Sequence, residues 1–209
     1  MSVTKWFIIW SVTVPSTWLA LLLAFLLSYV AVRVLYQKEE ADLVADSFFW
    51  LVIVWKLSVV LTDFKSVMSA PLSILYFHGG VVGFFLGLAA VIVKLFWERM
   101  KNRIGSASLV TAWIVALTVF QLAMAVLNPG DPLGSWATVV IFTSFLVVYW
   151  LKQADLSAGS WIWLAAAVHV FGASFQPEGW LGIPIAVTIV VSLAFGVLFQ
   201  IVSRSGEIA

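Results

Sequence analysis

Seven apolar runs occupy most of this chain of 209 residues. A helix needs about 20 apolar residues to cross the hydrocarbon core of a bilayer, and most of the runs approach that length. Only 10% of the residues are charged, where a soluble domain has roughly 25%. The sequence therefore predicts an all-α polytopic membrane protein, with a single seven-helix domain over residues 1–209. The expected transmembrane helices cover residues 16–36, 45–62, 75–94, 108–127, 136–151, 161–175 and 181–202.

Lysine and arginine are distributed unequally over the predicted loops. Such residues concentrate on the cytoplasmic side of membrane proteins. The other side of the predicted topology has Lys5 and Lys65. We therefore expect the N-terminus outside and the C-terminus in the cytoplasm, with the chain in the plasma membrane. The loops after the first, third, fifth and seventh helices contain Arg33, Lys38, Lys94, Arg99, Lys101, Arg103, Lys152 and Arg204.

The segment before the first predicted helix combines one lysine with aromatic residues. Lys5 is followed by Trp6, Phe7 and Trp10. No small-residue cleavage site of the kind that ends a signal peptide precedes the next apolar run. We expect this segment to lie at the membrane interface, where tryptophan is enriched.

Composition also excludes several classes of site. The chain has no cysteine, which rules out disulfides and thiolate metal ligands. With only two histidines we expect no metal site and no cofactor, although paired histidines can ligate haem as an alternative. The net charge of +1 gives no basic field for nucleic acid.

The third predicted helix has the most distinctive sequence, within residues 71–94. Gly79, Gly83 and Gly87 recur every four residues, so they form one stripe on a helix. Such a stripe lets a neighbouring backbone approach closely. We expect Gly83 and Gly87 to serve helix packing and this helix to be central in the bundle. His78 lies at its mouth, after the aromatic pair Tyr76 and Phe77.

Three basic side chains fall in the predicted outer half of the membrane. Lys56, His78 and His169 belong to the second, third and sixth predicted helices. An anionic phospholipid headgroup would neutralise a lysine there while its tails stay in hydrocarbon. We therefore predict a lipid-phosphate site of Lys56, His169, Gly79 and Gly80, with His78 as the candidate catalytic residue. Alternatively, Lys56 extends toward the surface, His78 bonds nearby backbone, and His169 is a buried neutral donor.

The sequence resembles a known family at these residues. One element, Pro71-Leu72-Ser73-Ile74 followed by His78-Gly79-Gly80-Val81-Val82-Gly83, resembles the third-helix signature of bacterial prolipoprotein diacylglyceryl transferases. Lys56 lies where that family has an arginine. The segment from His169 to Glu178 is similar to a later family element with two arginines and a glutamate. The resemblance implies seven helices and transfer of a diacylglyceryl group from phosphatidylglycerol to a lipoprotein cysteine.

The departures from the family pattern fall on its charged residues. The Gly-Arg-x-x-Asn-x-x-x-Gly-Glu motif of the family aligns with Phe120 to Met124 and the residues directly after them, without the arginine, asparagine or glutamate. In the later element the first arginine is His169, the glutamate is Ala173 and the second arginine is Gln176. Arginine stabilises a phosphate in ways that a neutral side chain does not, and losing one such contact typically costs 10²- to 10³-fold in rate.

Three functions are compatible with this pattern. The first is a non-catalytic lipid-binding or accessory membrane protein, with membrane phospholipid, such as phosphatidylglycerol, as its partner. The second is a transferase acting on phosphatidylglycerol or another lipid, with His78 as acid or base, because an imidazole titrates near neutral pH. The third is a structural subunit of a membrane complex, in which the glycine stripe or the tryptophan-rich surface packs against a membrane-protein partner.

Overall fold

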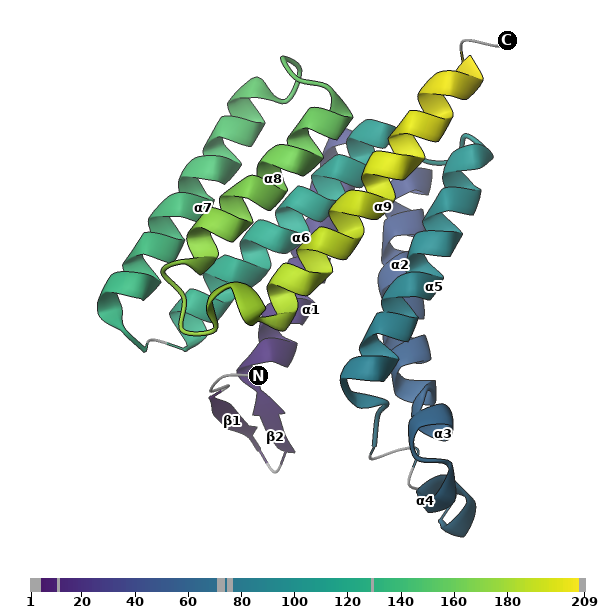
Figure 1. Cartoon of the computed structure of the whole chain (residues 1–209), viewed down its shortest axis with the longest axis vertical. Helices are drawn as coiled ribbons and strands as arrows, with labels where there is room; N and C mark the ends of the chain where they lie inside the picture. Colours follow the sequence, from purple (N-terminus) through teal and green to yellow (C-terminus); the bar gives the residue numbers. More distant parts are fainter. Residues whose placement is uncertain (1–4, 11, 71–73, 75–76, 129, 207–209) are drawn as a thin grey trace. The chain divides into compact units, whose positions relative to one another are not determined.

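The computed structural model describes residues 5–10, 12–70, 74, 77–128 and 130–206, and it is almost entirely helical (Figure 1). The prediction of an all-α fold is confirmed. Among the described residues, six helices are long and apolar enough to cross a membrane, by length and composition. They are α1 (Ser16–Leu35), α2 (Lys38–Leu57, continued by α3, Val59–Thr62), α5 (Gly80–Met100), α6 (Ser106–Leu127), α7 (Pro132–Lys152) and α9 (Ile183–Gly206).

The remaining apolar helix is shorter than the length that a crossing needs. Helix α8 (Ala158–Ala173) has 16 residues and runs antiparallel to α7, its neighbour in Figure 1. The Trp161 ring near the start of α8 packs edge-on against Tyr149 near the end of α7, with centroids 5.0 Å apart. At the opposite end, the backbone of Phe175 lies against Gly134. Helix α8 and its flanks therefore extend along the length of α7.

Helix α7 is longer than the sequence predicted. We expected this helix to cover residues 136–151, but α7 begins at Pro132. Proline is compatible with the first helical position, where its missing N–H would have no intrahelical partner. The Asp131 carboxylate accepts a hydrogen bond from the Gly134 N–H at 2.9 Å and caps the helix. Residues 132–135, which precede the predicted helix, are therefore the start of α7.

Charged residues that we assigned to loops also lie inside helices. Glu39 and Glu40 form part of the first turn of α2, where acidic side chains suit the helix dipole. Lys94 lies inside α5, which continues to Met100. A helix can include charged turns once it leaves the hydrocarbon, so bounds predicted from hydropathy alone made these helices too short.

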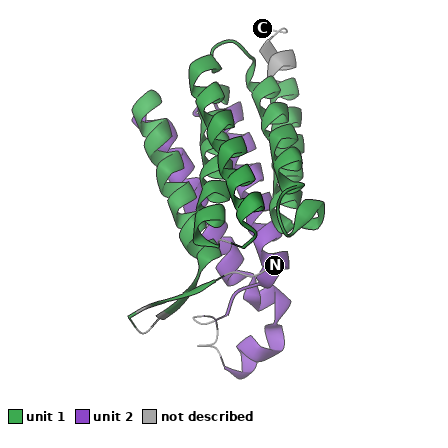
Figure 2. Cartoon of the chain, turned by 90° about the vertical axis from the view of Figure 1, so that its left-hand side faces the viewer, with its two compact units in different colours: residues 1–37, 106–209 green, residues 38–105 purple. Residues whose placement is uncertain are grey.

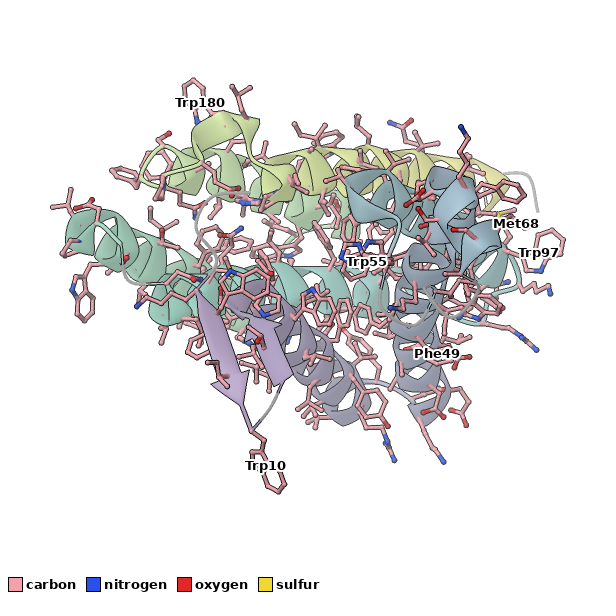
Figure 3. The ribbon with its side chains drawn as sticks, turned by 90° about the horizontal axis from the view of Figure 1, so that it is seen from below. Trp10, Phe49, Trp55, Met68, Trp97 and Trp180 are labelled. Atoms are coloured by element: carbon pink, nitrogen blue, oxygen red, sulfur yellow. The ribbon has the colours of Figure 1, made fainter. Side chains whose placement is uncertain are left out.

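The segment before α1 forms an antiparallel hairpin that the sequence did not predict. Strand β1 (Trp6–Ile9) pairs with β2 (Val12–Pro15), and Trp6 is opposite Pro15. Trp10 follows β1, and its side chain extends away from the ribbon (Figure 3).

The chain divides into two compact units, which are described separately (Figure 2). Unit 1 comprises residues 1–37 and 106–209. In it, α1 packs along α6 through a stripe of small buried residues, and the Ser28 hydroxyl donates to the Ala112 carbonyl of α6 at 2.6 Å. Helix α6 is the centre of unit 1, because α1, α7 and α8 all pack against it and half of its apolar window is buried. The stripe on α1 consists of Ser16, Ala20, Ala24, Ser28 and Val32.

Unit 2 comprises residues 38–105 and is held by the contact between α2 and α5. The glycine stripe of α5 faces the backbone of α2. A Cβ atom added at Gly83 would overlap the Ser58 hydroxyl, and one added at Gly87 would lie 2.8 Å from the Leu51 carbonyl oxygen. The two helices can approach this closely only because these positions have no side chain.

We predict that Gly87→Ala destabilises the protein. The added methyl group must push the backbone of α2 away, and overpacking of this kind costs about 1–3 kcal/mol, partly offset by about 1 kcal/mol of helix propensity. Thermal unfolding in detergent, followed by circular dichroism, should therefore show a lower midpoint. Gly159→Ala is the matched control, because nothing lies within 4 Å of a Cβ there. Equal midpoints for the two variants would contradict this account of the contact.

Candidate functional site

The start of α5 is fixed to α2 by three contacts with one tryptophan. The Gly79 N–H donates to the Trp55 carbonyl at 3.2 Å, and the Trp55 indole N–H donates to the Gly80 carbonyl at 2.8 Å. The His78 ring lies 4.7 Å from the Trp55 ring, centroid to centroid. Gly80 has φ +59°, a conformation that favours glycine, and this lets the chain turn from the loop into the helix. These contacts place His78 at the mouth of α5.

The His78 imidazole is exposed and has a defined protonation pattern. Its Nδ1 accepts a hydrogen bond from the Gly80 N–H at 3.0 Å, so the neutral ring has its proton on Nε2. Partial burial lowers the pKa of His78 below 6.5, and the charge of Lys56 lowers it further. The ring is therefore neutral at physiological pH, with its lone pair already engaged by the backbone.

This arrangement suits anion binding better than proton abstraction. Lys56 lies in the last turn of α2, half-buried and near enough to influence His78. Helix α5 begins at Gly80, and the positive end of a helix dipole favours an anion there. A general base needs an accessible lone pair, and the Nδ1 lone pair of His78 is engaged by the Gly80 N–H. Lys56, His78, Gly79 and Gly80 thus come together in unit 2. Pro71 and Tyr76, from the same predicted element, lie outside the described residues.

Unit 1 contains a second polar group, which is buried and neutral. His169 of α8 is fully buried. Its Nδ1 lies 2.6 Å from the Thr188 hydroxyl of α9, and its Nε2 lies 2.7 Å from the Gln121 amide nitrogen of α6. The Gln121 carbonyl oxygen accepts from the Gln176 amide at 2.9 Å, and that amide is 3.5 Å from the Thr138 hydroxyl of α7. We call these five residues the His169 chain.

The donors and acceptors of the His169 chain form one consistent pattern. An amide nitrogen only donates, so Nε2 of His169 must accept from Gln121 and the ring proton must be on Nδ1. That proton is donated to Thr188, whose hydroxyl donates in turn to the Pro184 carbonyl at 3.1 Å. Each imidazole nitrogen therefore has a partner, as a buried polar group requires. In this arrangement neither nitrogen of His169 can bind a lipid phosphate, although the sequence suggested that role.

Three members of the His169 chain are residues that the sequence resemblance aligns with arginines. Gln121 is the second residue of the stretch from Phe120, as arginine is second in the family motif. The same resemblance aligns His169 and Gln176 with the two arginines of the later element. The structure joins all three by hydrogen bonds. Sequence reasoning missed Thr188 and Thr138, which are polar residues inside apolar runs, and polar groups at membrane depth are a recognised signal of a site.

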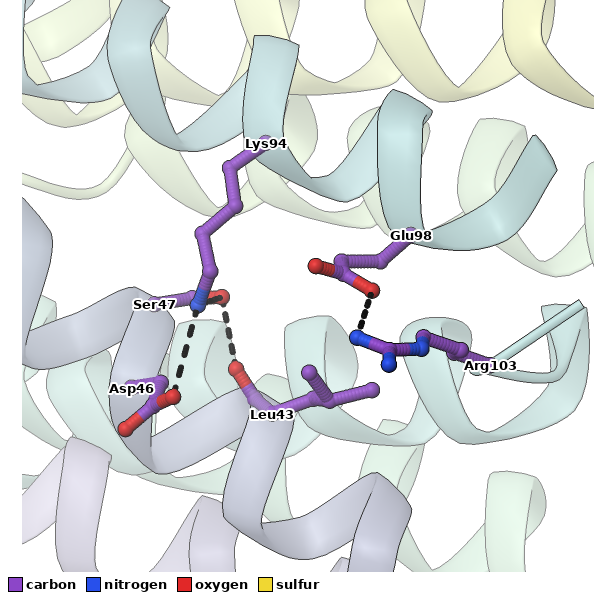
Figure 4. A network of polar contacts seen from close by, with 6 residues as sticks. All are labelled: Leu43, Asp46, Ser47, Lys94, Glu98 and Arg103. Atoms are coloured by element: carbon purple, nitrogen blue, oxygen red, sulfur yellow. Dashed lines mark hydrogen bonds and ion pairs between the residues drawn. The ribbon is translucent and has the colours of Figure 1, made fainter. Parts of the chain in front are cut away.

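A third polar group lies in unit 2, between α2 and α5 (Figure 4). The Lys94 ammonium is 4.0 Å from the Asp46 carboxylate and 3.4 Å from the Ser47 hydroxyl. Glu98, one turn further along α5, pairs at 3.3 Å with Arg103, which follows the end of the helix. Asp46 is 68% exposed, and exposed pairs stabilise a protein by about 0–1 kcal/mol. We interpret these residues as the polar end of the helix pair.

An apolar groove runs between α7 and α8 in unit 1. Its volume is about 440 Å³, within the range of roughly 300–1,000 Å³ that is usual for small-molecule sites. The groove is open and includes no residue of the His169 chain. It is lined by Ile141, Ser144, Phe145, Val148, Leu164, Ala167, Val168 and Phe171.

No family model, curated protein or solved structure matches the chain.

We predict that Thr188→Val destabilises the protein more than Thr118→Val does. The first change keeps the side-chain volume but leaves the His169 Nδ1–H without its partner, and a buried unsatisfied donor costs about 1–3 kcal/mol. Thr118 is equally buried, but its hydroxyl bonds to carbonyls of its own helix, at Ile114 and Val115. The measurement is the detergent unfolding midpoint of each variant. Similar losses for both would show that the His169 chain has no special role in stability.

Proposed function

We propose that this chain is a multi-pass protein of the bacterial plasma membrane that binds a phospholipid phosphate at the start of α5 and does not transfer diacylglyceryl groups. The proposal of phosphate binding depends on one observation, the convergence of Lys56, His78 and the first turn of α5. Lys56 supplies a positive charge, the His78 Nε2–H supplies a donor, and the helix terminus supplies further N–H groups. Phosphatidylglycerol is the ligand that we propose, because it combines a phosphate with tails that remain in hydrocarbon.

The chemistry of the His169 chain supports the second part of the proposal, that the protein does not transfer diacylglyceryl groups. Its members offer amide, hydroxyl and imidazole groups, all of them neutral in the observed hydrogen-bond pattern. A phosphate leaving group needs fixed positive charge that acts in the transition state. The positions that the family resemblance assigns to arginine are Gln121, His169 and Gln176, which stabilise the helix bundle through hydrogen bonds to one another. We infer a divergent, degenerate relative of the diacylglyceryl transferases.

We also propose seven crossings with the N-terminus outside. The ends of α8 lie near opposite ends of α7, which supports a crossing by α8 despite its 16 residues. With seven crossings, the loops after the first, third, fifth and seventh helices lie on the same side of the membrane. These are the loops to which we assigned eight basic residues. Because lysine and arginine concentrate in the cytoplasm, that side is the interior.

We predict that Lys56→Gln weakens binding of phosphatidylglycerol about tenfold or more. Hydrogen bonds to charged groups typically contribute about 1.5–3 kcal/mol, and glutamine, one bond shorter than lysine, stays polar but has no charge. Native mass spectrometry, with lipid titrated against the purified protein, measures the affinity. Lys65→Gln, in the short helix α4 (Phe64–Ser69) of the same unit, is the control and should bind as the unmodified protein does. Equal binding by both variants would exclude Lys56 from the site.

We further predict that the protein does not replace a diacylglyceryl transferase in living cells. Expressed in a strain depleted of that enzyme, it should leave a reporter lipoprotein at its unmodified mass. A genuine transferase serves as the positive control, and membrane fractionation checks that the protein is inserted. A mass increase equal to one diacylglyceryl group would overturn the non-catalytic proposal and favour the enzyme alternative, in which His78 is the acid or base.

A further inference from the structure

The N-terminal hairpin presents one apolar face outward. Alternate residues of a strand point to the same side, and Trp6 and Ile8 of β1 are 65% and 77% exposed. Trp10, which follows the strand, is 98% exposed. Phe7 and Val14, which pair with each other on the opposite face, are half-buried. The face of Trp6, Ile8 and Trp10, here called the tryptophan face, has no charged residue anywhere between positions 6 and 15.

Trp10 has a backbone conformation that disfavours a bulky side chain. Its φ is +60°, in the left-handed region. In a turn between the paired residues Ile9 and Val12, glycine, asparagine or aspartate would adopt this conformation at lower cost. The chain instead has its most exposed tryptophan there. Strained residues of this kind are commonly retained for a function.

Hydrogen bonds hold the base of the hairpin to the start of α1 and to the residue after α6. The Ser16 N–H, at the start of α1, donates to the Lys5 carbonyl at 2.9 Å. Asn128, directly after α6, accepts from the Lys5 N–H at 2.9 Å and from the Ser16 hydroxyl at 2.7 Å. Because α1 begins and α6 ends at this point, the hairpin base lies at the level of a membrane surface if the two helices cross.

We propose that the tryptophan face inserts into the interface of the bilayer, with Trp10 as its tip, and anchors the end of α1 against lipid. Tryptophan is enriched at this depth because its ring is apolar and its N–H is polar. Protein interfaces usually have a polar rim, whereas this face has no charge to select a protein partner. The inference is independent of the phosphate site, since the hairpin belongs to unit 1 and Lys56 to unit 2.

Spin labels on introduced cysteines test the proposal cleanly, because the chain has no cysteine of its own. We would label Trp10→Cys, Ile8→Cys and Phe7→Cys separately and reconstitute each purified protein into vesicles of phosphatidylethanolamine and phosphatidylglycerol. The readout is the ratio of label accessibility to oxygen, which partitions into lipid, and to a water-soluble nickel reagent. Leu22→Cys, an exposed position within α1, gives the lipid reference, and Asp155→Cys, in the exposed turn after α7, gives the aqueous one.

The expected result is a ratio at Trp10 and Ile8 well above that at Asp155, with lower accessibility to both reagents at Phe7 on the opposite face. A nickel accessibility at Trp10 equal to that at Asp155 would overturn the proposal, since no protein partner is present in the vesicles. Spin–spin broadening that grows with protein density would overturn it in favour of a second copy of the chain.

Discussion

A chain of hydrogen bonds built around one buried imidazole connects four helices of unit 1. His169 belongs to α8 and is bonded to Gln121 of α6 and to Thr188 of α9. Gln176 bonds to Gln121 and extends the chain toward Thr138 of α7. In hydrocarbon there is no water to bond a polar side chain, so each group in this chain depends on the next. The pattern has one consistent set of donors and acceptors, and it therefore specifies both the tautomer of the ring and the rotation of each helix that contributes to it.

In unit 2, the packing depends instead on glycines, which have no side chain, along one face of α5. The glycine stripe of α5 brings its backbone against α2, where Ser58, Trp55 and Leu51 form the facing surface. This close approach also builds the candidate phosphate site. The bonds of Gly79 and Gly80 to Trp55 hold His78 beside that ring, and Lys56 is the next residue along α2. A contact that serves packing thus positions the polar groups at the mouth of α5.

Sequence patterns located most of this architecture but placed several ends wrongly. Hydropathy found the core of each long helix, because the free energy of burial in lipid depends on composition. It misplaced the start of α7 and the end of α5, because capping by Asp131 and the charged turns around Glu98 are local features that a hydropathy average removes. The hairpin was missed because Trp6 to Pro15 has no strong strand alternation and its turn uses a tryptophan.

The sequence by itself determined that this chain is helical, apolar and suited to a membrane, and that one helix has a glycine stripe. These properties follow from composition and from spacing along a single helix. The tertiary structure alone decided that Gln121, His169, Gln176 and Thr188 meet, because residues separated by up to 67 positions converge only when helices pack. It also decided that His169 is enclosed while His78 is exposed, since two identical side chains differ only in what surrounds them.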